Sequence, residues 1–230
     1  MNSTSYQQNI AKVSARIRAS AQKCDRDAAE ITLLAVSKTQ PAAAVREAWQ
    51  AGARDFGENY LQDALQKIEA LADLPLCWHF IGPLQSNKTR AVAENFSWVH
   101  SVDRAKIARR LSEQRPPQLP PLQVCLQVNI SGEDSKAGVA VEELAELAAT
   151  VAALPRLQLR GLMAIPRSGL TGAQQRQPFA DLRREFEILQ RQHPQLDTLS
   201  MGMSADLEAA IFEGATIVRI GTDIFGPRIG

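Results

Sequence analysis

Lys38 follows a run of apolar residues that is typical of a buried strand. Residues 31–37 are Ile, Thr, Leu, Leu, Ala, Val and Ser, which indicates a strand covered on both faces. Pro41 suits the first turn of a following helix, so Lys38 falls at the carboxyl tip of the strand. A lysine in this place is either simply solvated, or it is held among apolar walls and becomes a nucleophile that forms a Schiff base. This segment alone leaves both interpretations open.

Two turns near the C-terminus combine glycine with hydroxyl groups. Ser200 and Ser204 belong to the run SMGMS before a predicted helix, and Gly221 and Thr222 follow the last predicted strand. Backbone N–H groups and hydroxyls in such turns are natural ligands of phosphate. Ser204 could instead act only as a helix cap. The presence of both turns in neighbouring loops favours a phosphate site.

Arg219 lies two residues before Gly221 on the last predicted strand. A buried arginine is unfavourable unless it has a partner, which would be a carboxylate such as Glu58 or Asp206, or an acceptor on a ligand. A Schiff-base lysine, a phosphate site and an arginine between them describe a site for pyridoxal 5′-phosphate (PLP). The permanently charged Arg219 would keep the pyridine nitrogen unprotonated, which makes the cofactor a weak electron sink.

Eight predicted strands that alternate with helices must position these residues. We predict strands at 31–37, 54–56, 76–81, 98–100, 122–130, 157–165, 195–199 and 216–220. We predict helices at 5–24, 41–50, 60–71, 86–95, 103–113, 141–153, 174–192 and 204–213, with Ser101 or Asp103 as one cap. This order predicts an α/β fold, one (β/α)8 TIM-type barrel over residues 1–230 with a leading helix within 1–27. An open doubly wound sheet is the alternative.

In such a barrel, functional side chains gather where the strands end. The residues at or just after the predicted strand ends form a mostly polar ring with one amine. They are Lys38, Asn59, His79, Ser101, Asn129, Met163, residues 200–204 and residues 219–222.

The bulk composition excludes several classes of function. A formal net charge of +1 gives no electrostatic reason to expect nucleic acid or an anionic membrane surface. No apolar run is long enough to span a bilayer, and the polar N-terminus lacks a secretory pattern, so we expect a cytoplasmic protein. Cys24, Cys77 and Cys125 are far apart and fit free thiols. The three histidines show no ligand spacing, and we expect no metal site.

Motifs along nearly the whole chain resemble the pyridoxal phosphate homeostasis protein family, which shares its fold with the N-terminal barrel of alanine racemase (fold type III of PLP proteins). The matching runs are LLAVSKTQP at 33–41, FGENYLQDA at 56–64, WHFIGPLQSNK at 78–88, LQVNISGEDSKAGV at 126–139, GLMAIP at 161–166, LSMGMSADLEAAI at 199–211 and VRIGTDIFGPR at 218–228.

The resemblance implies roles for individual residues. PLP would be bound to Lys38. Its phosphate and ring nitrogen would be held by Ser200, Ser204, Arg219, Gly221 and Thr222. The pocket would also be lined by Asn59, His79 and Met163.

The resemblance also indicates one expected difference from alanine racemase. That enzyme uses a second, β-rich domain whose tyrosine acts as a base, and we expect no room for such a domain after the last strand. Tyr6 and Tyr60 are the two tyrosines, and neither is an obvious second base, although Tyr60 falls near the barrel mouth. Without a second acid or base, racemisation should be slow or absent.

We therefore expect a monomeric, non-catalytic PLP carrier that binds, buffers and delivers the cofactor to apoenzymes. Lys136, in the loop after the fifth strand, is a candidate for a second, transient amine, or is simply solvated. A PLP-dependent amino-acid racemase is the first alternative. A Schiff-base aldolase without cofactor would use Lys38 but leave Arg219 unexplained, and an interaction scaffold would leave the polar ring without a purpose.

Overall fold

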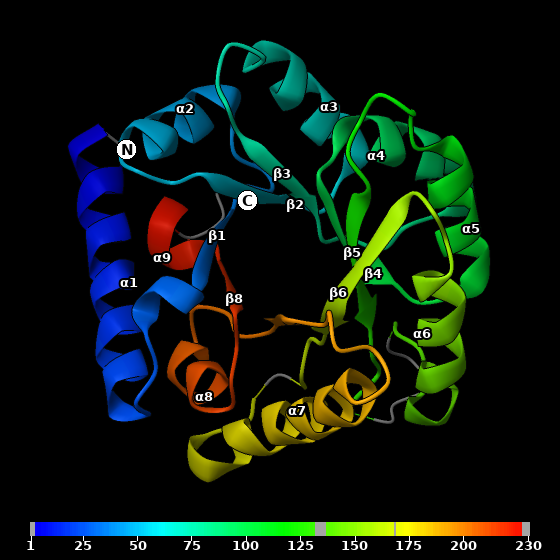
Figure 1. The fold of residues 1–230 in the computed structure, drawn as a ribbon. Helices are drawn as coiled ribbons and strands as arrows, with labels where there is room; N and C mark the ends of the chain where they lie inside the picture. The colour runs from blue at the N-terminus through cyan, green and yellow to red at the C-terminus, as the bar shows by residue number, and fades with distance from the viewer. Residues whose placement is uncertain (1–2, 132–136, 168, 227–230) are drawn as a thin grey trace.

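The chain folds into a closed barrel of eight parallel strands (Figure 1). A computed structural model describes residues 3–131, 137–167 and 169–226. Each strand pairs with the next in chain order, and β8 pairs with β1 to close the ring, with Leu34 opposite Arg219. The strands are β1 (Thr32–Val36), β2 (Asp55–Glu58), β3 (Cys77–Phe80), β4 (Trp98–Val102), β5 (Leu122–Gln127), β6 (Leu157–Met163), β7 (Thr198–Ser200) and β8 (Ile217–Ile220). The predicted (β/α)8 barrel is confirmed, and the open sheet is excluded.

The helices form a layer around the barrel (Figure 1). They are α1 (Ser3–Lys23), α2 (Ala42–Gln50), α3 (Leu61–Ala70), α4 (Thr89–Asn95), α5 (Ala105–Gln114), α6 (Leu144–Ala152), α7 (Arg176–Gln190), α8 (Leu207–Phe212) and α9 (Thr222–Phe225). Single 3-10 turns lie at Ala28–Glu30, Ser86–Lys88, Val141–Glu143 and Gly172–Gln175. Helix α1 contacts α2, α8 and α9, so it covers the region where the first and last strands meet.

The helices form where the sequence repeats apolar residues every three or four positions. In α1 the residues of this stripe are all buried: Tyr6, Ile10, Val13, Ile17 and Ala21. In α7 the buried stripe is Phe179, Leu182, Phe186 and Leu189, and Pro178 lies in the first turn as predicted. These stripes pack on the outside of the strands and form the larger part of the core.

A smaller cluster fills part of the barrel interior. Leu34, Val36, Ile81 and Ile217 pack together there, with Trp98 against them. Other inward positions are polar, including His79, His100 and Arg219, all of them buried. The interior therefore combines an apolar part with a buried polar part, and the polar part must be fully paired to be stable.

Several boundaries differ from the prediction. Helix α8 begins only at Leu207, so Ser204 is not its cap, and Asp206 Oδ1 accepts a hydrogen bond from the Met203 N–H instead. Helix α5 begins at Ala105 without a side-chain cap, so neither predicted cap is used. Strand β7 is only three residues long, and the short helix α9 directly after β8 was not predicted.

None of the helices in the described ranges has both the length and the apolar character that crossing a bilayer requires.

Candidate functional site

A cavity of about 330 Å³ opens among the loops that follow β1, β2, β3, β6, β7 and β8. Six of the nine predicted site residues line it: Lys38, Asn59, Ser204, Arg219, Gly221 and Thr222. Apolar side chains complete its wall: Val36, Ile81, Ile165, Met203 and Phe225. The cavity is thus lined by one amine, one guanidinium and the three hydroxyl-bearing residues Thr39, Ser204 and Thr222 within a mostly apolar wall, a composition typical of small-molecule sites.

Lys38 lies two residues after the end of β1 and is partly buried in the cavity wall. The next residue, Thr39, has a φ of +64°, in the left-handed region that a β-branched residue rarely adopts. Such a conformation costs on the order of 1–3 kcal/mol and persists only where the surroundings hold it. The backbone at Lys38 is therefore held in a definite, strained turn.

A buried ion pair stabilises the backbone beside that turn. Lys67 of α3 donates to Glu58 Oε1 at 2.7 Å and to the Ser37 carbonyl at 2.8 Å, and the Ser37 hydroxyl donates to the same Glu58 oxygen at 2.5 Å. Glu58 is fully buried, and burial raises the pKa of its carboxyl while Lys67 opposes the rise. Glu58 is thus the partner of Lys67 and not of Arg219, to which the sequence had assigned it as one option.

Asn59 offers an unused hydrogen-bond acceptor at the cavity. Its Oδ1 atom is buried and has no partner among the described residues, which is an unfavourable state unless a ligand donates to it. Gly82 permits this placement, since a Cβ atom at Gly82 would lie 2.1 Å from the Asn59 carbonyl oxygen. The glycine after β3 is therefore required by the close approach of Asn59.

Ser204, Gly221 and Thr222 line the same cavity, as predicted from the two turns. The turn before Ser204 contains Gly202 at a φ of +91°, where a Cβ atom would come within 2.5 Å of the Ala210 side chain. Only glycine fits there, and the hydroxyl of Ser204 is thereby brought to the loop that follows β8.

Helix α1 ties these two loops together, a role that the sequence did not suggest. Arg16 donates to the Ser204 carbonyl at 3.0 Å and forms ion pairs with Glu208 of α8 and Asp223 of α9. The leading helix therefore fixes the hydroxyl-bearing side of the cavity in addition to packing on the barrel.

Arg219 is buried, and its cation is held by the barrel backbone. It donates to the Ser200 carbonyl at 2.6 Å, to the Ser200 hydroxyl at 2.9 Å and to the Ala164 carbonyl at 2.9 Å. Burial lowers the pKa of Arg219 to about 10, and the nearby Asp206 opposes that change. Three of its five N–H groups are used by these partners, so up to two can reach a ligand.

Three predicted site residues, Ser200, His79 and Met163, lie one layer deeper in the barrel than expected. Side chains on a strand alternate between the inside and the outside of the barrel. The next inward-facing residue is therefore two positions further along, and that residue lines the cavity. On β3 that residue is Ile81, and after β6 it is Ile165. Tyr60 does not line this cavity and is 56% exposed, and Lys136 lies outside the described residues.

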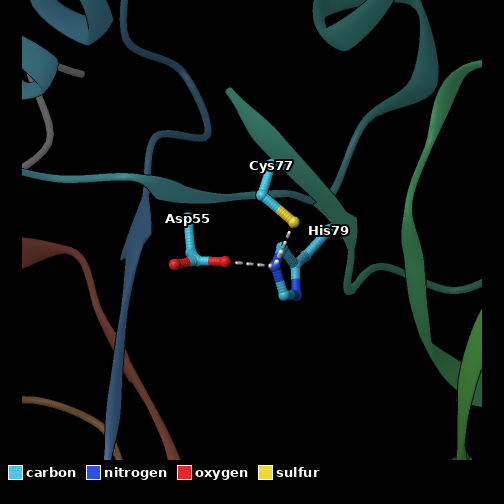
Figure 2. Close-up of side chains that lie close together, drawn as sticks. All are labelled: Asp55, Cys77 and His79. Atoms are coloured by element: carbon cyan, nitrogen blue, oxygen red, sulfur yellow. Dashed lines mark hydrogen bonds and ion pairs between the residues drawn. The ribbon is translucent and has the colours of Figure 1, made fainter. Parts of the chain in front are cut away.

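Asp55, Cys77 and His79 form a cluster at the amino-terminal end of the barrel that sequence spacing did not reveal (Figure 2). His79 Nε2 lies 3.0 Å from Asp55 Oδ1 and 3.3 Å from Cys77 Sγ, and the three donor atoms are all within 4.8 Å of one another. Asp55 and Cys77 are opposite each other on paired strands, and His79 is two residues along. Their common inward orientation, every second residue on neighbouring strands, was the available signal.

The two buried histidines predict how stability depends on pH. Burial lowers the pKa of His79, and burial, His79 and Arg219 together lower that of His100 well below 6.5. As pH falls, the unfolded chain therefore binds protons at a higher pH than the folded protein does. The free energy of unfolding is highest above pH 6.5 and decreases below it, by about 1.4 kcal/mol per pH unit for each ring. Urea unfolding between pH 7.5 and 5.5 measures this slope. A His193→Gln variant should keep it, and a flat profile in the wild type would contradict the burial argument.

The chain is similar to known proteins over nearly its full length. The family model "Alanine racemase, N-terminal domain" matches residues 9–228. A Pseudomonas aeruginosa protein named pyridoxal phosphate homeostasis protein is 67% identical over 221 residues, covering 96% of this chain and 95% of that protein. The Escherichia coli K12 protein of the same name is 55% identical over 223 residues, again covering 96% and 95%.

Solved structures agree with these relatives. PipY of Synechococcus elongatus, in a structure described as having PLP bound, is 41% identical and superposes with a TM-score of 0.84, covering 96% of this chain and 100% of PipY. Alanine racemase of Corynebacterium glutamicum superposes with a TM-score of 0.70 at 16% identity, covering 96% of this chain and 61% of the racemase. The second likeness supports the fold alone.

Proposed function

Since this chain belongs to the alanine racemase N-terminal domain family, we propose that it binds PLP and acts in PLP homeostasis, with the cofactor held as a Schiff base on Lys38 and no robust catalysis of its own. One observation carries the proposal: Lys38, Arg219 and the loops of Ser204 and Thr222 line a single cavity. This is the set of groups that an aldehyde, a pyridine nitrogen and a phosphate require.

Each group has a defined task in that proposal. When bound, PLP supplies an aldehyde that condenses with an amine, and Lys38 is the amine in the cavity. Arg219, which is permanently charged, would hold the ring nitrogen and keep it unprotonated. Ser204, Gly221 and Thr222 would hold the phosphate, and the buried Oδ1 of Asn59 would accept a hydrogen bond from the ligand. His79, Met163 and Ser200 support the site from the layer beneath.

Two features support a carrier and not a racemase. No tyrosine is among the described residues that line the cavity, so a base opposite Lys38 is not in place. Ile165 and Met203, which do line it, are 45% and 38% exposed, so the cavity mouth faces solvent. We infer that a cofactor at such a mouth can be passed to apoenzymes. We propose that the protein acts as a monomer. Its three free cysteines fit the reducing cytoplasm.

The test separates binding from turnover. The protein with PLP is incubated with a panel of amino acids in deuterium oxide, and the exchange of the Cα proton is followed by NMR. We expect a Schiff-base absorbance and exchange no faster than with free PLP. Sustained exchange would support the racemase alternative, and the absence of any Schiff-base absorbance would exclude the carrier.

Arg16→Ala should weaken PLP binding although Arg16 does not line the cavity. The change removes the contact to the Ser204 carbonyl and the ion pairs to α8 and α9, which loosens both phosphate-side loops. We expect a loss on the order of tenfold in affinity, comparable to one charged hydrogen bond. Equilibrium dialysis of PLP measures it. Arg18→Ala, an exposed arginine on the same helix, is the matched control, and equal affinities for the two variants would contradict the role given to α1.

A further inference from the structure

Five buried or partly buried side chains form a continuous hydrogen-bonded row through the barrel, from its amino-terminal end to the cavity. They are Asp55, His79, His100, Ser200 and Arg219, and we call them the polar row. We propose that the first four members of this row are positioning residues that hold Arg219 charged and correctly oriented, with every hydrogen bond pointing from Arg219 toward Asp55. The effect on bound cofactor rests on the proposed function, whereas the direction of the row does not.

Consecutive contacts of hydrogen-bond length join the row. Asp55 Oδ1 lies 3.0 Å from His79 Nε2, and His79 Nδ1 lies 2.9 Å from His100 Nε2. His100 Nδ1 is 2.8 Å from the Ser200 hydroxyl, which accepts from Arg219 Nη1 at 2.9 Å. The two histidines and Ser200 are buried, so water does not compete for these groups.

The two ends of the row fix the proton on every member between them. Arg219 can only donate, so the Ser200 oxygen accepts, and among the described residues His100 Nδ1 is the acceptor within reach of the Ser200 proton. His100 then carries its proton on Nε2 and donates to His79 Nδ1. His79 in turn carries its proton on Nε2 and donates to the Asp55 carboxylate, which can only accept. Both rings are thus neutral and in the same tautomer.

This order has an electrostatic consequence for Arg219. Every neutral member turns its lone pair toward the guanidinium and its N–H or O–H toward Asp55, so the dipoles add up along the row. Asp55, the only formal anion in the row, is 27% exposed at the far end and remains hydrated there. The aligned dipoles thereby stabilise the buried Arg219 cation, which no carboxylate of the described residues contacts. Burial lowers the pKa of both histidines, in accord with neutral rings.

A metal ion on Asp55, Cys77 and His79 is the competing use of the same end of the row (Figure 2). A metal needs the lone pair of His79 Nε2, so the His79 proton would move to Nδ1 and the direction of the whole row would reverse. The Ser200 hydroxyl would then receive hydrogen bonds from both His100 and Arg219, and its own proton would have no other acceptor among the described residues. The polar row therefore favours the metal-free arrangement.

The first test reads the tautomers directly in the protein without cofactor. Nitrogen-15 NMR of the imidazole rings distinguishes a proton on Nδ1 from one on Nε2, and His193 serves as an internal reference. We expect His79 and His100 to be neutral at pH 7 with the proton on Nε2. A proton on Nδ1 of either ring, or a charged ring, would overturn the proposal. Tight binding of added Zn²⁺ that Cys77→Ala abolishes would do the same.

The second test measures the effect at the other end of the row. Asp55→Ala removes the terminal acceptor and charge, and Asp55→Asn keeps an acceptor oxygen without the charge. We expect PLP affinity to fall about tenfold in Asp55→Ala and less in Asp55→Asn, while the adduct on Lys38 still forms. Cys77→Ala changes a neighbour of His79 that is outside the row and should bind PLP normally.

A failure of the positioning role can be distinguished from a failure of the proposed function. If wild-type protein does not bind PLP, the proposed function fails, and the NMR result still decides the direction of the row. If wild-type protein binds PLP and Asp55→Ala binds it equally well, the positioning role is wrong. Thermal unfolding of each variant shows whether a loss of affinity is simply a loss of fold.

Discussion

Lys38→Ala is expected to abolish covalent binding of PLP. Among the described residues, Lys38 is the one lysine that lines the cavity, so no other amine of that part of the chain can replace it there. Titration of the variant with PLP should give the spectrum of the free aldehyde, while the wild type gives a Schiff-base band. The loops that we propose to bind the phosphate remain in the variant, so equilibrium dialysis should still detect weaker, non-covalent binding.

The control for that result is a lysine elsewhere on the surface. Lys106 is exposed on α5, and Lys106→Ala should titrate as the wild type does. A Schiff-base band of undiminished strength in Lys38→Ala would show that another lysine carries the cofactor, and the role of Lys38 would have to be abandoned.

Lys67→Met is expected to destabilise the protein by about 3–5 kcal/mol, the usual effect of leaving a buried charge without its partner. The change removes the cation that contacts Glu58, and the carboxylate itself is fully buried. It also removes the hydrogen bond to the Ser37 carbonyl, next to Lys38. Urea unfolding at pH 7 measures the loss.

The pH dependence of the same variant supplies a check on its cause. The pKa of Glu58 is already raised by burial, so the folded protein binds this proton more tightly than the unfolded chain does. That favours folding at low pH, and the benefit disappears as pH rises from 4.5 through the raised value. The deficit of Lys67→Met should therefore shrink on acidification. Glu58→Gln combined with Lys67→Met should recover part of the stability, and a deficit below about 1 kcal/mol would contradict the buried pair.

Much of the fold could be predicted because the strands are short apolar runs and the helices repeat with a clear period. Six of the nine predicted site residues line one cavity, and all of them follow from one rule, that barrel sites lie where strands end. The rule does not say how deep a given residue lies. His79 was predicted at the strand end, but Ile81 occupies that level, because each inward position is two residues from the next.

The contacts that hold the site in place could not be predicted in this way. Arg16 is 188 residues from the Ser204 carbonyl that it contacts, and His100 is 100 residues from Ser200. Such pairs arise only when the barrel closes, and local patterns of polarity carry no information about them. Arg219 illustrates the result: the sequence required a partner for the buried cation, and the structure supplies backbone carbonyls and Ser200 in place of a carboxylate.

The measurement that tests the central claim most directly is a peptide map after reduction. Wild-type protein is incubated with PLP, treated with borohydride, digested and analysed by mass spectrometry. We predict a single pyridoxyl modification, on the peptide that contains Lys38. An unmodified Lys38 peptide, or a modification that resides mainly on another lysine, would contradict the account.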